Sequence, residues 1–297
     1  MAVSVEKEEY NVGGLRVNVF AKAGLRYASA EPVVVLIALH GRLGSADNME
    51  ATAHGMLQWA EEKRAAGAKQ RDLVFVTFDQ RNHGSRIVDP HANGAWSKDA
   101  DEHNERHAVD MYSIQTGTAR DVSFVLDFLP AYLFPDDERT VAEWALMGVS
   151  LGGHAVWLAL KDEPRVRIGI PIIGCPDYMT LMQLRADKQG VSLGPPYMPA
   201  SLRATVHASD PPHASYRAAD RSNPYFGKKI LVLSGADDVL VPWSASRAFV
   251  DALVVGEHGR KEVMLLEGVG HQYTEAMKWE AFRFVWEEAL VVKGSAL

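Results

Sequence analysis

The 297-residue chain is poor in the features that mark several common protein classes. It has a single cysteine, Cys175, which excludes an intrachain disulfide and a cysteine-rich metal site. Its 38 Asp and Glu residues outnumber 31 Lys and Arg, giving a net charge of −7. This balance argues against a nucleic-acid-binding protein, which usually carries a basic face. No apolar run approaches the ~20 residues of a membrane span.

Signals for targeting are also missing. The first residues, MAVSVEKEEY, lack a basic segment followed by an apolar one, so we expect no secretory signal. Together with the low cysteine content, this predicts a cytoplasmic location. We expect no cofactor and no nucleic-acid partner, and nothing in the sequence excludes a homo-oligomer. The 47% hydrophobic content is ordinary for a globular enzyme-sized domain and suffices for a large core.

Short β-rich runs alternate with helical patterns along the chain. Strands are predicted at 15–22, 32–41, 72–80, 141–150, 166–175, 228–238 and 261–271. Helices are predicted from Ser45 to about Gly67 and at 117–130, where Pro130 closes the helix, and also at 151–162, 244–254 and 274–290. This alternation indicates an α/β fold, with a mostly parallel central sheet covered by helices on both faces.

Two long segments interrupt this alternation. Residues 84–116 are polar, and residues 176–227 contain seven of the 14 prolines. Loops of this length are usually functional or disordered. We therefore predict a core formed by residues 1–175 and 228–297, with residues 176–227 inserted as a cap over the carboxyl edge of the sheet.

The segment ALMGVSLGGHA at 145–155 carries the strongest chemical signal. Ser150 lies between Gly148 and Gly152, after a predicted strand and before a predicted helix. This G-x-S-x-G context is typical of a nucleophile held on a sharp turn, where side-chain-free neighbours let strand and helix approach. The alternative is a structural glycine turn without chemistry. A nucleophilic serine needs a base and a group that orients the base.

Suitable partners follow the last two predicted strands. His271 lies after one strand, and Asp237 and Asp238 lie after the other. The carboxyl ends of parallel strands share one edge, where open α/β sheets bind ligands. An oxyanion hole needs two backbone N–H donors, for which we expect Leu151 and either Arg42 or, as second choice, Leu43.

At this point the chain resembles the serine esterase and lipase branch of the α/β-hydrolase superfamily. The resemblance is carried by HGRLG, GVSLGG, GADDVLVP and GVGH, in this order, and spans about residues 32–290. It implies Ser150 as nucleophile, His271 as base, and Asp238 rather than Asp237 as the orienting acid. Serine at the turn implies acyl transfer through an acyl-enzyme.

Several other residues have weaker assignments. Substrate contacts are predicted at His40, Tyr178, Met179 and Tyr197. Bracing of the oxyanion loop is the alternative for His40, and packing of the cap onto the sheet is an equally weighted alternative for the three cap residues. Asp79, Arg81 and His83 are expected to hold their loop together by hydrogen bonds. His103 and His107 are one helical turn apart, but no third metal ligand is obvious. We expect His154 and Cys175 to be packing residues.

The combined prediction is a hydrolase of a small-molecule carboxylic ester, using Ser150, His271 and Asp238. A peptidase or amidase, a lactonase and an acyltransferase would use the same three residues. A non-catalytic binding protein on this fold and a metal-dependent hydrolase are alternatives of other classes.

Overall fold

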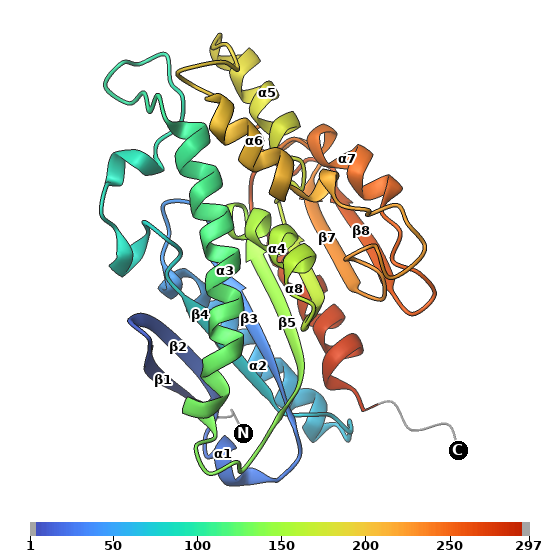
Figure 1. Ribbon diagram of the computed structural model, residues 1–297. Coiled ribbons are helices and arrows are strands. Elements are labelled where there is room, and N and C mark those ends of the chain that lie inside the picture. Colours follow the sequence, from blue (N-terminus) through green and yellow to red (C-terminus); the bar gives the residue numbers. More distant parts are fainter. Residues whose placement is uncertain (1–3, 293–297) are drawn as a thin grey trace.

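The computed structural model describes residues 4–292, which form one eight-stranded sheet (Figure 1). The strand order is β1-β2-β4-β3-β5-β6-β7-β8. β1 and β2 run antiparallel to their neighbours, and the other six strands are parallel. The strands are β1 Val5–Val12, β2 Leu15–Lys22, β3 Val33–Leu39, β4 Leu73–Phe78, β5 Val141–Val149, β6 Val166–Ile172, β7 Lys229–Gly235 and β8 Arg260–Leu266.

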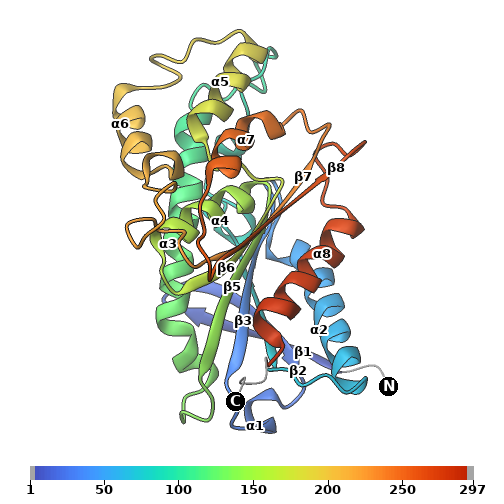
Figure 2. The same ribbon diagram turned by 90° about the vertical axis from the view of Figure 1, so that its right-hand side faces the viewer.

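Helices cover both faces of the sheet, as predicted. α3, α4 and α7 pack on one face, and α2 and α8 pack on the other (Figure 2). The helices are α1 Leu25–Ala28, α2 Glu50–Ala65, α3 His107–Leu133, α4 Leu151–Asp162, α5 Tyr178–Gln189, α6 Ala200–Ser209, α7 Trp243–Ala252 and α8 Glu275–Val285. Within residues 4–292 none of these helices is both long and apolar enough to traverse a bilayer.

The apolar run of β3 explains its central position. All seven residues of β3 are buried. Val33, Val35 and Ile37 join the core on one face, while Val34 and Leu36 join the core on the other. A strand without polar residues on either face can be accommodated only between two layers of helices.

Several boundaries differ from those that the sequence predicts, the start of α3 most of all. α3 begins at His107 instead of residue 117, because Met111 and Ile114 already face the core. Pro130 lies inside this helix and does not end it. The strand β1 was not predicted, because its mostly exposed residues give little apolar alternation.

The strand order creates a switch point between β3 and β5. β4 lies on one side of β3 and β5 lies on the other, with Leu39 of β3 paired with Gly148 of β5. The loops that follow these two strands therefore begin side by side and diverge. In open α/β sheets, ligands bind in the crevice formed at such a point.

Residues 176–227 lie between β6 and β7 and contain α5 and α6. Both helices lie at the top of Figure 1, at the same end of the molecule as the loops after the parallel strands. The division into a core and a cap stays a prediction.

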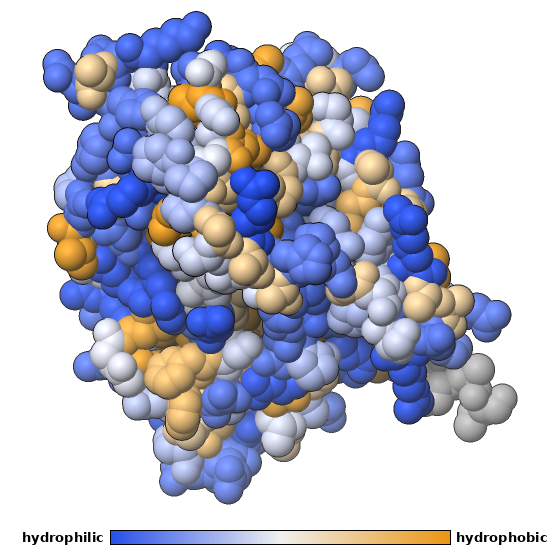
Figure 3. All heavy atoms as spheres, turned by 45° about the horizontal axis from the view of Figure 1, so that its top comes forward, coloured by the Kyte–Doolittle hydropathy of each residue, from blue (hydrophilic) through white to orange (hydrophobic). Residues whose placement is uncertain are grey.

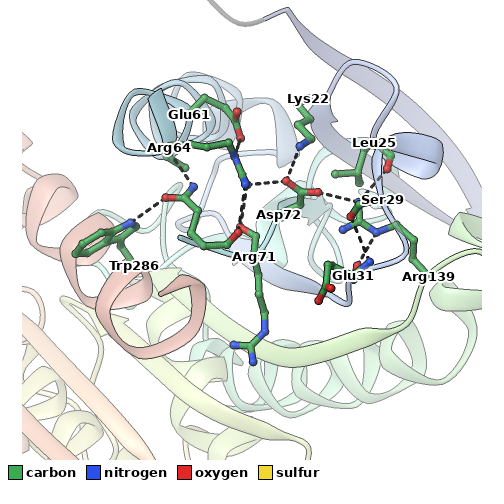
Figure 4. Close-up of polar contacts among 12 residues, drawn as sticks. Lys22, Leu25, Ser29, Glu31, Glu61, Arg64, Arg71, Asp72, Arg139 and Trp286 are labelled. Atoms are coloured by element: carbon green, nitrogen blue, oxygen red, sulfur yellow. Dashed lines mark hydrogen bonds and ion pairs between the residues drawn. The ribbon is translucent and has the colours of Figure 1, made fainter. Parts of the chain in front are cut away.

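A cluster of ion pairs lies at the amino ends of the parallel strands, at the other end of the sheet from the loops that follow them (Figure 4). Asp72, which directly precedes β4, accepts hydrogen bonds from Lys22, Arg64 and Arg139. Asp72 is only 6% exposed and the Arg139 side chain is fully buried. Burial alone would raise the pKa of Asp72, but hydrogen bonds from Lys22 and Arg139 and the neighbouring charges lower it overall. The carboxylate is therefore ionised in the folded chain and joins β2, α2 and the segment before β5.

We predict that Asp72→Asn lowers the free energy of unfolding by about 3–5 kcal/mol, measured by urea denaturation. The substitution keeps the size of the side chain but leaves the buried Arg139 guanidinium without an anionic partner. Asp47→Asn is the matched control, because Asp47 is exposed and lies 3.6 Å from Lys7. Its effect should stay within about 0.5 kcal/mol.

The same contact predicts a pH dependence. Since folding lowers the pKa of Asp72 below its ordinary value of about 3.9, its contribution is present at neutral pH. This contribution is lost as pH falls from about 4 toward the folded-state pKa. The stability difference between the wild type and Asp72→Asn should narrow over that range, and a constant difference would contradict the assignment.

Candidate active site

Ser150 lies on a tight turn between β5 and α4. Its backbone has φ 54° and ψ −107°, a conformation that residues other than glycine rarely adopt. A Cβ added to Gly148 would lie 2.4 Å from the backbone carbon of Gly152, so the strand and the helix touch at the turn. The backbone N–H of Ser150 donates to Ile172 at 2.8 Å, and that of Gly152 donates to His40 at 3.2 Å. The turn is thus tied to both neighbouring strand ends.

The structure brings Ser150, His271 and Asp238 together. The Oγ atom of Ser150 is 2.8 Å from Nε2 of His271. Nδ1 of His271 is 2.7 Å from Oδ2 of Asp238. A carboxylate can only accept, so Nδ1 carries the proton and Nε2 presents its lone pair to the Ser150 hydroxyl.

Asp238 is fixed by the loop after β7. Its Oδ1 accepts hydrogen bonds from the backbone N–H groups of Leu240 and Val241, at 2.8 and 2.9 Å. Asp238 is 3% exposed, and burial by itself would raise its pKa. The hydrogen bonds from His271 and these two amides lower the pKa overall, so the group is ionised. Asp237 is exposed and does not contact His271.

Ser150 and His271 open into a cavity of about 380 Å³. This volume suits a small or medium organic molecule. Much of the wall is apolar, with Trp96, Met111, Val149, Ile173, Val239 and Leu240. Figure 3 brings this end of the molecule forward and shows hydrophobic residues among hydrophilic ones.

Backbone strain is concentrated at this cavity. Five residues other than glycine have positive φ within residues 4–292, and three of them line it: Leu43, Ser150 and Ile173. Ile173 is the most unusual, because β-branched residues strongly avoid this region. Such conformations persist where the surroundings enforce them, most often at functional sites.

The two predicted oxyanion-hole residues lie beside Ser150. Leu151 is the first residue of α4, so its backbone N–H has no acceptor within the helix. Gly41 lies next to the turn, since an added Cβ would be 3.9 Å from Cβ of Ser150. Arg42 and Leu43 follow directly and line the cavity. The N–H of Arg42 donates no hydrogen bond within the described part of the chain.

The structure does not bring the four predicted substrate contacts into the cavity wall. His40 is fully buried, with Nδ1 against the Gly41 carbonyl and Nε2 accepting from Gln80. Burial lowers its pKa to about 4, so it is a neutral brace for the loop after β3.

The cap residues of that prediction act as packing residues. Tyr178 is 2% exposed and donates to the Ala108 carbonyl. Met179 packs against the core cluster below α5. Tyr197 contacts the ring of Trp96 at a centroid distance of 5.9 Å, behind the wall.

Hydrogen bonds hold the loop after β4, as predicted. Asp79 accepts from the backbone of Ala46 and from both the backbone and hydroxyl of Ser85, at 2.7–2.8 Å. Arg81 donates two hydrogen bonds to Asp121. The Nδ1 atom of His83 is 2.9 Å from the Arg81 carbonyl.

The three other histidines considered in the sequence analysis, His103, His107 and His154, have hydrogen-bond partners. The N–H of Cys175 donates to Nδ1 of His154 at 2.9 Å, and both side chains are buried. His103 contacts the backbone of Ser97. His107 lines the cavity, with Nδ1 2.8 Å from the Gly94 carbonyl. Across residues 4–292, no three His, Cys, Asp or Glu side chains are grouped so as to hold a metal ion.

The sequence analysis did not identify the basic residues that line the cavity. Arg185 and Lys188 of α5 line the cavity together with Arg42. Their spacing of three residues puts both on one side of a helix, which is the signal that the sequence offered. The signal depends on a helix over Tyr178–Gln189, which the apolar pattern of 176–227 does not predict.

Comparisons with known proteins identify the fold. No family model and no curated protein matches the chain. The solved structure of TT1662 from Thermus thermophilus is 23% identical, with a TM-score of 0.65, covering 96% of this chain and 99% of that one. An acetyl xylan esterase from Paenibacillus sp. R4 is 17% identical, with a TM-score of 0.54, covering 96% and 84%.

A larger protein shares the fold over part of its length. The acylaminoacyl peptidase of Pyrococcus horikoshii is 11% identical, with a TM-score of 0.62, covering all of this chain and 43% of that one. With the strand order and the turn at Ser150, these similarities confirm the predicted α/β-hydrolase fold.

We predict that Gly148→Ala lowers the free energy of unfolding by about 2–4 kcal/mol, because the new methyl group would meet the backbone of Gly152. Gly55→Ala in α2 is the control. Its methyl group would lie 3.7 Å from the Phe282 ring, an ordinary contact, so it should stabilise by about 0.5–1 kcal/mol. Chemical denaturation measures both. A Gly148→Ala protein of wild-type stability would show that the turn is not tightly packed.

Proposed function

We propose that the protein is a serine hydrolase that cleaves a carboxylic ester through an acyl-enzyme. One observation carries the proposal: the Ser150 hydroxyl, the His271 imidazole and the Asp238 carboxylate form a continuous hydrogen-bonded chain at a cavity. A serine hydroxyl is a weak nucleophile until an adjacent base accepts its proton.

In the first half-reaction, Oγ of Ser150 attacks the ester carbonyl carbon as its proton passes to Nε2 of His271. Asp238 holds the imidazole in the required tautomer and stabilises the imidazolium that forms. The tetrahedral intermediate collapses to an acyl-enzyme, and His271 gives its proton to the departing alcohol. In the second half-reaction, His271 takes a proton from water, which attacks the acyl carbon. The second tetrahedral intermediate collapses as His271 returns this proton to Oγ of Ser150, which releases the acid and regenerates the enzyme.

The negative charge on the carbonyl oxygen needs donors that are already oriented. The backbone N–H groups of Leu151 and Arg42 are our candidates, because neither has an acceptor in its own element and both flank Ser150. The N-terminus of α4 adds a favourable field for this charge. A single donor of this kind is typically worth ~3 kcal/mol of transition-state stabilisation.

The similar structures include an acetyl xylan esterase and an acylaminoacyl peptidase. Ester and amide cleavage both occur on this fold, so the choice rests on the cavity. We assign esters because part of the wall is apolar and, among residues 4–292, no acidic side chain lines it to receive a peptide amino terminus.

We predict that Ser150→Ala lowers kcat/KM for short esters such as p-nitrophenyl acetate and butyrate by at least about 10³-fold, because the nucleophile is removed. A fluorophosphonate probe should label the wild type at Ser150 and leave the variant unlabelled, with mass spectrometry as the readout. Undiminished turnover by Ser150→Ala would reject the mechanism. Faster cleavage of matched p-nitroanilides than of esters would favour an amidase.

The two neighbouring aspartates provide a matched comparison. Asp238→Asn should lower kcat by about 10²–10⁴-fold, because an amide no longer fixes the proton on Nδ1 of His271. Asp237→Asn removes the same charge from the neighbouring residue, which is exposed. Its kcat should stay within about threefold of the wild-type value. Equal losses in both variants would show that net charge, and not the contact to His271, matters.

A further inference from the structure

The wall of the cavity beside Ser150 carries positive charge. Arg42, Arg185 and Lys188 line it, and no Asp or Glu of residues 4–292 does. The chain as a whole is acidic, with a net charge of −7. Three cations around one opening therefore run against the overall charge and call for a separate explanation.

Neither arginine forms an ion pair within residues 4–292. Arg42 donates to the Asn93 carbonyl at 2.9 Å. Arg185 donates to the Leu240 carbonyl at 3.3 Å and to Nε2 of His107 at 3.1 Å. These contacts occupy two of the five N–H donors of Arg185, and all of the acceptors are neutral.

Most of the other buried and half-buried arginines within residues 4–292 are paired with carboxylates. Arg139 and Arg64 pair with Asp72, and Arg86 pairs with Asp121. Arg71 is an exception, since it is half-buried and donates only to the Ala289 carbonyl, but it does not line the cavity. Unpaired buried charge is costly unless a partner arrives.

The two arginines also act on each other. Burial, and to a smaller extent the charge on Arg42, lowers the pKa of Arg185 to about 10. His107 accepts from Arg185, so its proton is on Nδ1 and the ring is neutral; burial and the adjacent Arg185 lower its pKa to about 3. An anion bound between the arginines would relieve both the burial cost and the repulsion.

We propose that the substrate is an ester that also carries an oxyanionic group, a carboxylate or a phosphate, bound by Arg185 and Arg42 with Lys188 at the cavity rim. This inference rests on the proposed function and names the substrate class of the same site. A guanidinium presents two parallel N–H donors that match either oxyanion. His107 is a positioning residue, since it fixes the orientation of the Arg185 guanidinium.

The test compares anionic esters with neutral esters of the same shape. Monoethyl glutarate against ethyl valerate places the charge on the acyl side. 4-Acetoxybenzoate against 4-methylphenyl acetate places a carboxylate on the alcohol side, and 4-acetoxyphenyl phosphate replaces that carboxylate by a phosphate. The measured quantity is the ratio of kcat/KM for the anionic ester to that for its neutral counterpart.

We predict a ratio of at least about 10 for one of the pairs in the wild type, decreasing with added salt. Arg185→Gln should lower this ratio by about 10- to 100-fold, mainly through KM, because a charged hydrogen bond is lost. Arg185→Lys should recover part of it. Lys188→Gln, at an exposed position that cannot affect folding, should lower it about threefold.

Arg120→Gln is the matched control. Arg120 is an exposed arginine of α3 outside the cavity, so its removal changes the net charge equally and should leave the ratio unchanged. Ratios of 1 or less for all pairs, with turnover that depends on Ser150, would overturn the inference and leave the proposed function intact.

A binding measurement tests the anion site independently of ester cleavage. Titration calorimetry of monoethyl glutarate into Ser150→Ala protein needs no turnover. If wild-type protein cleaves no ester but this ligand binds, with binding weakened in the Ser150→Ala, Arg185→Gln double variant, the anion site stands and the proposed function fails. Absence of binding in that case would overturn the inference as well.

Discussion

The close contact between the start of α4 and the ends of β3 and β5 is the constraint on which the site depends. Gly152 approaches β3 so closely that an added Cβ would lie 2.6 Å from the Leu39 carbonyl oxygen. This approach leaves no room for a relaxed turn, and Ser150 takes up the bend at φ 54°. The hydroxyl is thereby held at the sheet edge, where the loop carrying His271 reaches it.

Charged residues are paired at the amino ends of the strands and unpaired at the cavity near their carboxyl ends. At the amino edge, Asp72 gathers three cations into a buried cluster that joins distant parts of the chain. At the carboxyl ends, Arg42 and Arg185 share a cavity that no carboxylate of residues 4–292 lines. Compensated charge stabilises a fold, whereas uncompensated charge beside Ser150 is available to a ligand.

The fold and the residues brought together at Ser150 could largely be predicted from the sequence, because both depend on strand ends. Apolar β-branched runs mark buried parallel strands, and polar residues directly after them must meet at one edge. Ser150, Asp238 and His271 each follow such a run. β1 and the first ten residues of α3 gave no comparable signal, since a mostly exposed edge strand and a polar helix start lack clear apolar periodicity.

The cavity wall was predicted poorly for a related reason. Its residues come from loops and from α5, whose positions follow from tertiary packing and not from strand order. Aromatic residues of the cap such as Tyr178 were expected in the wall, but they pack inward because their rings fill the space below α5. Arg185 takes the position facing the cavity instead.

The residues at Ser150 and the cations of the cavity wall come from different parts of the fold, which has a consequence for substrate specificity. Ser150, Asp238 and His271, which we propose to carry out hydrolysis, lie at the carboxyl ends of the strands. The cations come from the loop after β3, which packs against the turn at Ser150, and from the segment between β6 and β7. The length and sequence of the segment between β6 and β7 can change without disturbing β5 or α4. Arg185 depends on the insertion for its place and on His107, at the start of α3, for its orientation. Under the proposed substrate class, the preference for an anionic ester can therefore be weakened by changes in α5, while the geometry at Ser150 stays the same.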